Sequence, residues 1–411
     1  MMRNIVIIGG GAAGLMAAVA AGGEDRKITV VEKNARPARK VMITGKGRCN
    51  VTNDCDVQTL ISNVARGGKF LYSAFSAFGP ADTKTFFESR GVPLKTERGN
   101  RVFPVSDKAV DIVDALTLAA KEHAVIITGA AEEIISRDGA VTGVKLASGK
   151  ILPADAVVLA TGGKSYPLTG STGDGYGMAV RLGHTVTPAV PSLIGLEIRE
   201  GFCTKLAGLT LKNVTLSLYK SGVKKPVYTE LGEMLFTHTG ISGPLALSAS
   251  AHIEGDPKDY CVEIDLKPAL DTKTLDSRIL RDFSEEKNRD LINSLDKLLP
   301  KSLIPVIIAL SGIDLHKKVN QITQKDRQSL INVIKSLSMR VSGLGPIEEA
   351  VITRGGIVTS EINPSDMSSK LIKGLYFAGE VIDVDAYTGG FNLQIAFSTG
   401  YLAGKSASKD I

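Results

Sequence analysis

The chain has 411 residues, of which 43% are hydrophobic, and its mean hydropathy of +0.10 is typical of a globular protein with a large core. This length exceeds one ordinary core, so two or three domains are expected. No apolar run is long enough to span a membrane, and glycines interrupt the first apolar segment, which disfavours a signal peptide. We therefore expect a cytoplasmic protein without a membrane partner.

The charge distribution argues against nucleic acid as a main partner. The 49 Lys and Arg residues exceed the 43 Asp and Glu residues by a net +6, but they form no long basic run. Such a charge can attract anionic cofactors or substrates, and it is a weak signal for nucleic-acid binding. The four cysteines, Cys49, Cys55, Cys203 and Cys261, form no CxxC pair and lack a nearby histidine set, so neither a metal site nor a disulfide framework is predicted.

The N-terminal segment predicts a dinucleotide-binding turn. Residues 5–8 are β-branched and apolar, as in a short buried strand, and an Ala-rich helical stretch extends to residue 21. Between them, Gly9, Gly11 and Gly14 have G-x-G-x-x-G spacing. Gly9 allows the sharp turn, Gly11 lets the backbone approach a pyrophosphate, and Gly14 lets the helix pack closely on the strand. The helix N-terminus offers unpaired N–H groups to the anion.

A second strand, residues 27–31, ends at an acid. Glu32 follows Gly14 by 18 residues, a position from which a carboxylate can accept hydrogen bonds from both ribose hydroxyls. An acid here favours an unphosphorylated adenosine ribose, as in FAD or NAD.

The segment 33–53 is too rich in glycine and charge to form a regular element. Because it follows the ribose acid directly, we expect it to run along the dinucleotide, although a solvated basic loop is the alternative. The residues available to phosphate are Arg39, Lys40 and Arg48, and those available to polar ring edges are Thr44, Gly45, Asn50 and Thr52. Residues 57–123 are then mostly helical in pattern.

A run of strands follows, over residues 124–128, 131–136 and 141–146 and at Ile151. Residues 156–160 form another buried strand, and the Thr161-Gly162-Gly163 loop after it lets the backbone pass close to a cofactor. The glycine-rich residues 165–175 lead into a helix over 176–182.

The pattern changes from about residue 188. Residues 193–218 alternate in short β-like runs, 230–244 are expected to form a turn, and 259–266 form a strand. Residues 270–337 are helical and lysine-rich, with expected stops at Pro300, Pro305 and Gly312. The pattern therefore predicts that this part is an insert with a β unit and a helical subdomain.

The dinucleotide pattern returns near the C-terminus. A buried strand ends in Ala378-Gly-Glu380, and Thr388-Gly-Gly-Phe-Asn-Leu-Gln394 begins a terminal helix. The strand-end acid can bind a ribityl hydroxyl, and the N–H groups at the helix start can face the pyrimidine oxygen of a flavin. A plain helix entry at Gly389-Gly390 is the alternative.

These patterns, with Thr44-Gly-Lys-Gly-Arg-Cys-Asn-Val-Thr-Asn53 and Gly232-Glu-Met-Leu-Phe-Thr-His-Thr-Gly-Ile-Ser-Gly-Pro244, closely resemble the BaiN/YhiN-type bacterial flavoproteins over essentially the whole chain. More distantly, Thr161-Gly-Gly163 and Thr172-Gly-Asp-Gly175 resemble fumarate-reductase flavoproteins. The resemblance implies an α/β fold: a glutathione-reductase-type, FAD-binding Rossmann domain with noncovalent FAD, interrupted by an insert domain. The expected boundaries are 1–190 and 345–411 for the FAD domain and 191–344 for the insert, β-rich over 191–268 and helical over about 269–337.

The resemblance also implies individual cofactor contacts. Around the pyrophosphate and adenosine these are Gly9, Gly11, Ala12, Ala13, Gly14, Glu32, Lys33 and the Ala131 backbone. Toward the flavin they are Lys40, Thr44, Gly45, Arg48, Asn50, Glu380, Gly390, Phe391, Asn392 and Leu393, with Thr161 and Gly162 in the strand-end loop.

Two reaction classes fit the resemblance. One is a reductase that passes hydride from NAD(P)H through FAD to an activated C=C bond, as in dehydro-bile-acid reduction. The other is an oxidase of a small amine such as aminoacetone, with oxygen as acceptor. Only one dinucleotide fingerprint is present, so NAD(P)H is expected to bind transiently over the flavin. A flavin-dependent RNA-modifying protein is a minor alternative, supported only by the lysine-rich residues 267–335.

Two residues are candidates for the substrate side. His238 lies in a turn bounded by glycine and proline, and Arg354, in Thr353-Arg-Gly-Gly356, can bind a carboxylate. The alternatives are that His238 has only a structural role and that Arg354 is an ordinary surface arginine. A small-molecule substrate is expected, while its identity and the oligomeric state remain open.

Overall fold

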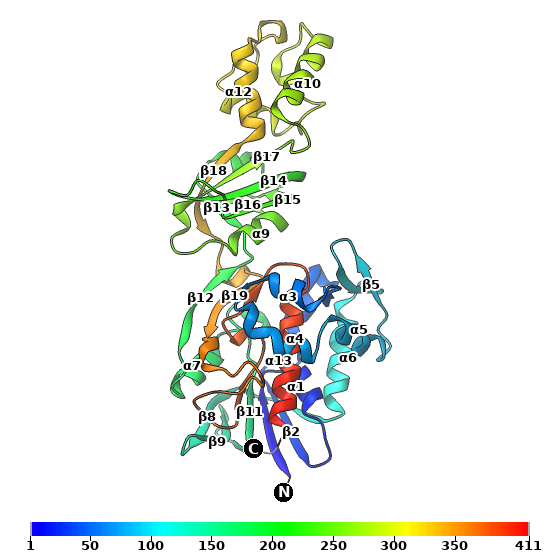
Figure 1. Ribbon diagram of the computed structural model, residues 1–411, viewed down its shortest axis with the longest axis vertical. Coiled ribbons are helices and arrows are strands. Elements are labelled where there is room, and N and C mark those ends of the chain that lie inside the picture. Colours follow the sequence, from blue (N-terminus) through cyan, green and yellow to red (C-terminus); the bar gives the residue numbers. More distant parts are fainter. Residues whose placement is uncertain (1, 410–411) are drawn as a thin grey trace. The chain divides into compact units, whose positions relative to one another are not determined.

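The computed structural model describes residues 2–409 and divides into two compact units (Figure 1). Unit 1 comprises Met1–Ser192 and Ile347–Ile411, and unit 2 comprises Leu193–Pro346. Unit 1 is therefore built from two separate stretches of chain. Each unit has its own hydrophobic core.

A parallel sheet of five strands forms the centre of unit 1, in the order β20-β11-β1-β2-β7. The strands are β1 (Arg3–Ile8), β2 (Arg26–Glu32), β7 (Ala124–Thr128), β11 (Ala156–Leu159) and β20 (Leu375–Phe377). Because β20 comes from the C-terminal stretch, the last part of the chain completes a sheet that the first part begins. The carboxyl ends of these strands meet at one edge, where parallel sheets bind ligands.

Two helices pack unusually closely beside this sheet, α1 (Ala12–Ala21) and α13 (Phe391–Ala407) (Figure 1). A Cβ atom on Gly400 would lie 2.3 Å from the carbonyl oxygen of Ala13, and one on Gly404 would lie 2.1 Å from that of Ala17. Any side chain at these two glycines would force the helices apart. The Ala-rich face of α1 and the glycines of α13 thus bring the two ends of the chain into backbone contact.

Smaller elements surround the central sheet of unit 1. The helices are α2 (Arg39–Ile43), α3 (Val57–Ser62), α4 (Tyr72–Ala77), α5 (Pro80–Glu88), α6 (Ala109–Lys121) and α7 (Asp174–Arg181). The strands are β3 (Thr52–Asn53), β4 (Val64–Arg66), β5 (Leu94–Glu97), β6 (Arg101–Pro104), β8 (Ala131–Arg137), β9 (Ala140–Leu146), β10 (Ile151–Pro153), β12 (Val186–Ser192), β19 (Ile352–Ile357) and β21 (Asp385–Ala386). The chain leaves unit 1 along β12 and returns along β19, and these two strands pair antiparallel.

Unit 2 contains a closed barrel of six strands in the order β13-β16-β15-β14-β17-β18. The strands are β13 (Leu196–Ile198), β14 (Thr210–Lys220), β15 (Tyr228–Phe236), β16 (Gly240–Ser242), β17 (Tyr260–Asp265) and β18 (Leu337–Leu344). The helices are α8 (Phe202–Lys205), α9 (Pro244–Ser250), α10 (Thr272–Glu285), α11 (Ile304–Leu310) and α12 (Gln324–Lys335). Figure 1 shows α10 and α12 beyond β17 and β18.

Two local expectations for unit 2 were wrong. Residues 230–236 belong to strand β15 and not to a turn. A Cβ atom on Gly232 would lie 2.9 Å from Leu245 Cδ2, so this glycine makes room for α9 against the strand. Pro305 lies in the first turn of α11 and does not stop a helix, because the N–H that proline lacks has no partner in a first turn.

One expectation for unit 1 was also wrong. The segment after Glu32 contains the short helix α2 and a tight turn over Thr44–Gly47, although its composition predicted no regular element. Among residues 2–409, no helix combines the length and apolarity needed to cross a bilayer.

Candidate cofactor-binding site

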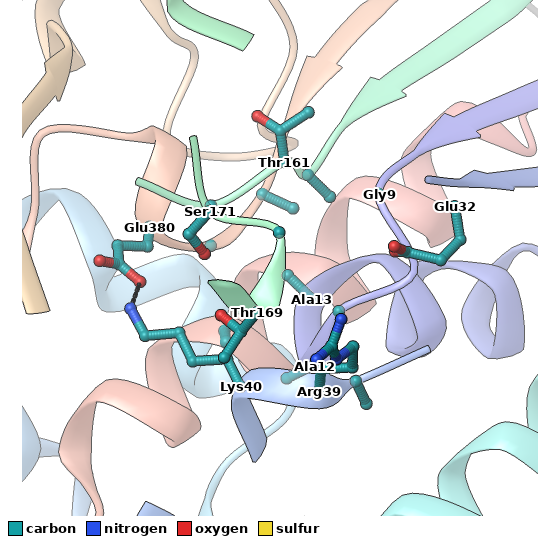
Figure 2. Close-up of a pocket in the computed structure, with 18 of the residues that line it drawn as sticks. Gly9, Ala12, Ala13, Glu32, Arg39, Lys40, Thr161, Thr169, Ser171 and Glu380 are labelled. Carbon is teal, nitrogen blue, oxygen red and sulfur yellow. Dashed lines mark hydrogen bonds and ion pairs between the residues drawn. The ribbon is translucent and has the colours of Figure 1, made fainter. Parts of the chain in front are cut away.

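A large cavity lies at the carboxyl edge of the parallel sheet of unit 1 (Figure 2). Its empty volume is about 1350 Å³, including space open to solvent. Among the described residues, most of those that line it come from the segments after β1, β2, β11 and β20, from the segment 169–174 and from the start of α13. The others are residues 129–131 after β7, Met178 of α7, residues 351–352 and Val384. All of them belong to unit 1.

The three fingerprint glycines have different surroundings at this cavity. Gly9 has φ +104°, and a Cβ atom there would lie 2.4 Å from Ala160 O. A Cβ atom on Gly14 would lie 1.8 Å from Gly9 O, so both positions exclude any side chain. A Cβ atom on Gly11 would meet nothing within 4 Å and would enter the open space above the start of α1. The turn thus leaves room for a ligand group beside the helix N-terminus.

Glu32 supports this turn as well as lining the cavity. Its Oε2 accepts a 2.8 Å hydrogen bond from Gly10 N, and its Oε1 accepts hydrogen bonds of 2.8 Å from both Asn34 N and Asn34 Nδ2. An ionised carboxylate has about four acceptor positions, so one remains for a ligand hydroxyl. Glu32 therefore has a structural role in this turn, and the ribose contact expected from the sequence stays a prediction.

A network of polar side chains crosses another part of the cavity. Lys40 Nζ lies 2.7 Å from Glu380 Oε2 (Figure 2). It also donates a 2.5 Å hydrogen bond to Ser165 Oγ. Ser165 Oγ donates to Glu380 Oε1 at 3.0 Å, and Thr353 N donates to the same oxygen at 2.7 Å. These contacts join four separate segments of unit 1 around one lysine–glutamate pair.

The segment 164–174 is held to the loop after β2 by two further side chains. Lys33 Nζ donates to Thr172 Oγ1 at 2.5 Å and lies 2.6 Å from Asp174 Oδ2. Asn34 Nδ2 donates to Thr169 O at 3.1 Å. Since Lys33, Asn34, Thr169 and Asp174 all line the cavity, this segment forms part of its wall.

The start of α13 borders the cavity through Asn392 and Leu393. Gly390 has φ +100°, and a Cβ atom there would lie 2.4 Å from Thr52 O, so only glycine lets the chain enter the helix here. The Asn392 carboxamide accepts a hydrogen bond from Ala386 N at 2.9 Å and donates to Ala386 O at 2.8 Å. This side chain therefore ties β21 to the first turn of α13.

The structure brings many of the predicted cofactor residues together around this cavity. Those that line it are Gly9, Gly11, Ala12, Ala13, Glu32, Lys33, Lys40, Thr44, Ala131, Thr161, Gly162, Glu380, Asn392 and Leu393. Those outside the lining are Gly14, Gly45, Arg48, Asn50, Gly390 and Phe391.

Arg48 illustrates why some predicted residues are not in the lining. Its guanidinium pairs with Glu97 at 2.5 Å and with Asp107 at 2.6 Å, and it lies 4.2 Å from the centroid of the Phe103 ring. These contacts raise the pKa of Arg48 through hydrogen bonds to Glu97 and Asp107. This arginine anchors the 44–50 loop to β5 and β6, a role that spacing along the sequence does not reveal.

The two candidates for the substrate side lie in different units. Arg354 is buried, with 8% of its surface exposed, on β19 of unit 1. His238 is exposed in the turn between β15 and β16 of unit 2, and its backbone oxygen accepts a 2.9 Å hydrogen bond from Thr204 Oγ1. Neither lines the cavity.

Sequence reasoning missed several residues of this region. Ser165 and Asp385 are both fully buried, and Asp385 Oδ2 accepts a 2.9 Å hydrogen bond from Ser192 Oγ. Burial raises the pKa of Asp385, while Ser192 and the nearby Arg66 and Arg354 oppose that rise. The glycine-rich segment around Ser165 follows the end of a strand, and this position could have indicated that Ser165 belongs to the site. Asp385 lies in no comparable motif.

The residues present fit FAD. Thr161 lines the cavity, and its Oγ1 is buried with no hydrogen-bond partner within residues 2–409, so a polar position is left there for a ligand. The first turn of α1 carries no acidic residue and no side-chain cap, which leaves its N–H groups to an anion such as a pyrophosphate.

Comparison with known proteins agrees with this geometry. The model of the HI0933-like protein Rossmann domain family matches residues 3–406. A 3-dehydro-bile acid delta(4,6)-reductase of Clostridium scindens is 31% identical over 94% of this chain and 93% of its own. A ribosomal RNA dihydrouridine synthase of Escherichia coli is 29% identical, with 96% of each chain covered.

A solved structure shows the same fold. The 3-ketosteroid-delta4-(5alpha)-dehydrogenase of Rhodococcus jostii RHA1 has a TM-score of 0.50 at 16% identity, over 99% of this chain and 97% of that one. The predicted α/β fold with a Rossmann-type FAD-binding domain is confirmed, as is the family resemblance. The chain belongs to the HI0933-like Rossmann family and is an FAD-dependent oxidoreductase.

Proposed function

We propose that this protein reduces an activated C=C bond in a small organic substrate, with hydride passing from NAD(P)H through noncovalent FAD. The observation that carries this proposal is the 31% identity over 94% of the chain to a protein named for the reduction of a dehydro-bile acid. A dihydrouridine synthase adds hydrogen to the ring double bond of uridine, so the second relative points to related chemistry. In both substrates the double bond is conjugated to a carbonyl group.

FAD, when bound, supplies the two-electron chemistry, and the protein supplies binding, orientation and electrostatics. We assign the pyrophosphate to the Gly9–Gly14 turn and the start of α1, and the adenosine to Glu32, Lys33 and the Ala131 backbone. Lys40, Thr44 and Glu380 serve the ribityl side, with Thr161 and Gly162 beside them, and the 390–393 turn serves the isoalloxazine. Gly45, Arg48 and Asn50 shape the loop that carries Thr44.

The substrate side needs a group that stabilises negative charge. Addition of hydride to the β-carbon of a conjugated carbonyl compound moves an electron pair toward the carbonyl oxygen, and a positioned cation lowers the energy of that state. We assign this role to Arg354, whose neighbour Thr353 donates to the cavity residue Glu380.

Substitution of Arg354 tests this assignment. For Arg354→Met we expect kcat/KM to fall by about a hundredfold, the usual cost of losing one charge-stabilising group, with an unchanged flavin spectrum. Arg137→Met is the matched control, because the Arg137 side chain is 84% exposed. Equal activity of the two variants in steady-state assays would remove Arg354 from the mechanism.

The competing reactions are separated by one experiment. The purified protein is mixed anaerobically with NADH, NADPH or aminoacetone in a stopped-flow instrument, and the flavin absorbance is followed. We expect a pyridine nucleotide to bleach the flavin and a 3-oxo-4,6-diene steroid to restore its colour faster than oxygen does. Bleaching by aminoacetone alone, with fast reoxidation by oxygen, would instead establish the amine oxidase.

Reduction of uridine in ribosomal RNA is a second candidate, favoured by the relative named for that reaction. It is tested in the same instrument with unmodified ribosomal RNA as the oxidant. Reoxidation by RNA together with formation of dihydrouridine, and none by the steroid, would replace the small-molecule substrate with RNA.

A further inference from the structure

A buried carboxamide holds the first turns of α13. Gln394 is fully buried, and its Oε1 accepts hydrogen bonds from Thr52 Oγ1 at 2.5 Å and from Thr83 Oγ1 at 2.9 Å. Its Nε2 donates to Phe78 O at 3.1 Å and to Ser398 Oγ at 2.9 Å. These four bonds use both donors and both acceptor positions of the amide. Such a fully satisfied network inside a core fixes one arrangement of the segments that it joins.

Two further contacts join β3 to the start of the helix. Asn53 Nδ2 donates to Gly389 O at 3.0 Å, and Gly390 lies directly against the Thr52 backbone. With the Gln394–Thr52 bond, three contacts therefore join β3 to the beginning of α13. Thr83, in contrast, connects Gln394 to α5. Neither α5 nor β3 lines the cavity, but β3 also contacts Gly389 and Gly390 directly before the helix.

The position of this helix start matters for a bound flavin. Asn392 and Leu393 line the cavity, and the N–H groups of a first helical turn have no partner within the helix. They carry partial positive charge, which favours an anionic ligand state over a neutral one. These dipoles stabilise charge only while their orientation is fixed. Movement of the first turn of α13 would therefore weaken the preference of the site for the reduced, negatively charged flavin.

We propose that Gln394 is a positioning residue that, through its bond to Thr52, fixes the start of α13 against β3 and so sets the preference of the site for reduced over oxidised FAD. This inference rests on the FAD site assigned under the proposed function. It concerns the reduction potential of the holoenzyme and holds for any substrate.

The test compares two isosteric variants, Thr52→Val and Thr83→Val. Both threonines are fully buried, and each donates one hydrogen bond to the same oxygen of Gln394. The midpoint potential of each flavin-loaded protein is measured by anaerobic equilibration with a redox dye, alongside Tm and the Kd for oxidised FAD. For Thr52→Val we expect the affinity for reduced FAD to fall about tenfold more than that for oxidised FAD, which lowers a two-electron potential by about 30 mV. For Thr83→Val we expect a lower Tm and the wild-type potential.

Gln394→Met keeps the test decisive if Thr52→Val loses its flavin, because it removes all four bonds with little change in side-chain volume. A potential equal to that of the wild type in Gln394→Met or Thr52→Val, with only Tm lowered, would show a purely structural network and overturn the inference. Equal shifts in the two valine variants would overturn the specific role of the β3 contact. A wild-type protein that neither contains nor binds FAD would contradict the proposed function instead.

Discussion

At the scale of single residues, neighbouring glycines of one motif have separate tasks. Gly14 permits contact between two backbone segments, since its Cβ would lie 1.8 Å from Gly9 O, whereas Gly11 faces open space. Their substitution by alanine should therefore affect different properties of the protein.

We expect Gly14→Ala to destabilise the FAD-free protein by about 1–3 kcal/mol, the usual cost of overpacking, and to lower its Tm. Gly11→Ala should leave that Tm unchanged and weaken FAD binding, because its methyl group enters the cavity. Urea unfolding and FAD titration of the two apoproteins check both statements. A Gly14→Ala apoprotein with the wild-type free energy of unfolding would contradict the close contact between Gly14 and Gly9 O.

His184 makes stability depend on pH. Only 3% of this residue is exposed, its Nδ1 lies 3.1 Å from Glu361 Oε2, and its Nε2 lies 2.8 Å from Ser369 Oγ. Burial lowers the pKa of His184 below its ordinary value, although the hydrogen bond to Glu361 opposes that shift. Below about pH 6.5, the ordinary pKa of histidine, the unfolded chain therefore binds more protons than the folded one.

The contribution of neutral His184 to the free energy of unfolding is fully present above about pH 6.5. It is lost as the pH falls through the lower pKa that His184 has in the folded state. We expect the free energy of unfolding, measured with urea, to decrease from pH 7 to pH 5. His184→Gln should reduce this decrease, and His316→Gln, at a side chain that is 75% exposed, should not. An unchanged slope in His184→Gln would assign the pH dependence to other groups.

At the scale of elements, the segment 164–174 forms a wall of the cavity that is held by side chains of the loop after β2. Lys33 makes two of these contacts, to Thr172 and Asp174. Loss of the Lys33 ammonium group removes both contacts and leaves the hydrogen bond from Asn34 Nδ2 to Thr169 O.

We expect Lys33→Met to speed the dissociation of FAD by about tenfold, which corresponds to the roughly 1.4 kcal/mol typical of one charge-assisted hydrogen bond. The release of FAD is followed by the rise in flavin fluorescence after dilution. Lys27→Met is the control, because Lys27 is an exposed lysine on β2, the strand that precedes Lys33, and this variant should release FAD at the wild-type rate. Similar rates for both variants would show that the segment does not retain the cofactor.

At the scale of the whole molecule, the cavity belongs to one unit although that unit is discontinuous in sequence. Every described lining residue lies in unit 1. Ser192 at the end of β12 pairs with Ile352 of β19, so the two connections to unit 2 leave unit 1 at neighbouring positions.

This pairing predicts that unit 1 survives removal of the insert. With residues 193–346 replaced by a short Gly-Ser linker, we expect a folded protein that binds FAD, as seen by circular dichroism and flavin absorbance. Turnover of substrate should be lost if unit 2 contributes to its binding. A deletion protein that folds but cannot bind FAD would show that the cofactor site requires unit 2.

The family, the fold class and the FAD-dependent chemistry were predictable because they depend on local patterns. A strand, a glycine turn and a helix are specified by consecutive residues, and the acid at Glu32 follows at a spacing set by the length of one helix and one strand. The turn predicted over residues 230–236 was wrong because packing against another segment decides the conformation there. Gly232 lies in β15 and makes room for Leu245 of α9.

The sequence by itself determined that both ends of the chain carry cofactor-binding patterns, because each pattern is a short run of residues with its own backbone requirements. Only the tertiary structure decided which side chains of those runs face the cavity. Arg48 turns to Glu97 and Asp107, while Gln394 joins Thr52 and Thr83 inside the core. The physical reason is that charged and amide groups bind the nearest partner with suitable geometry, and folding brings together partners that are far apart in sequence.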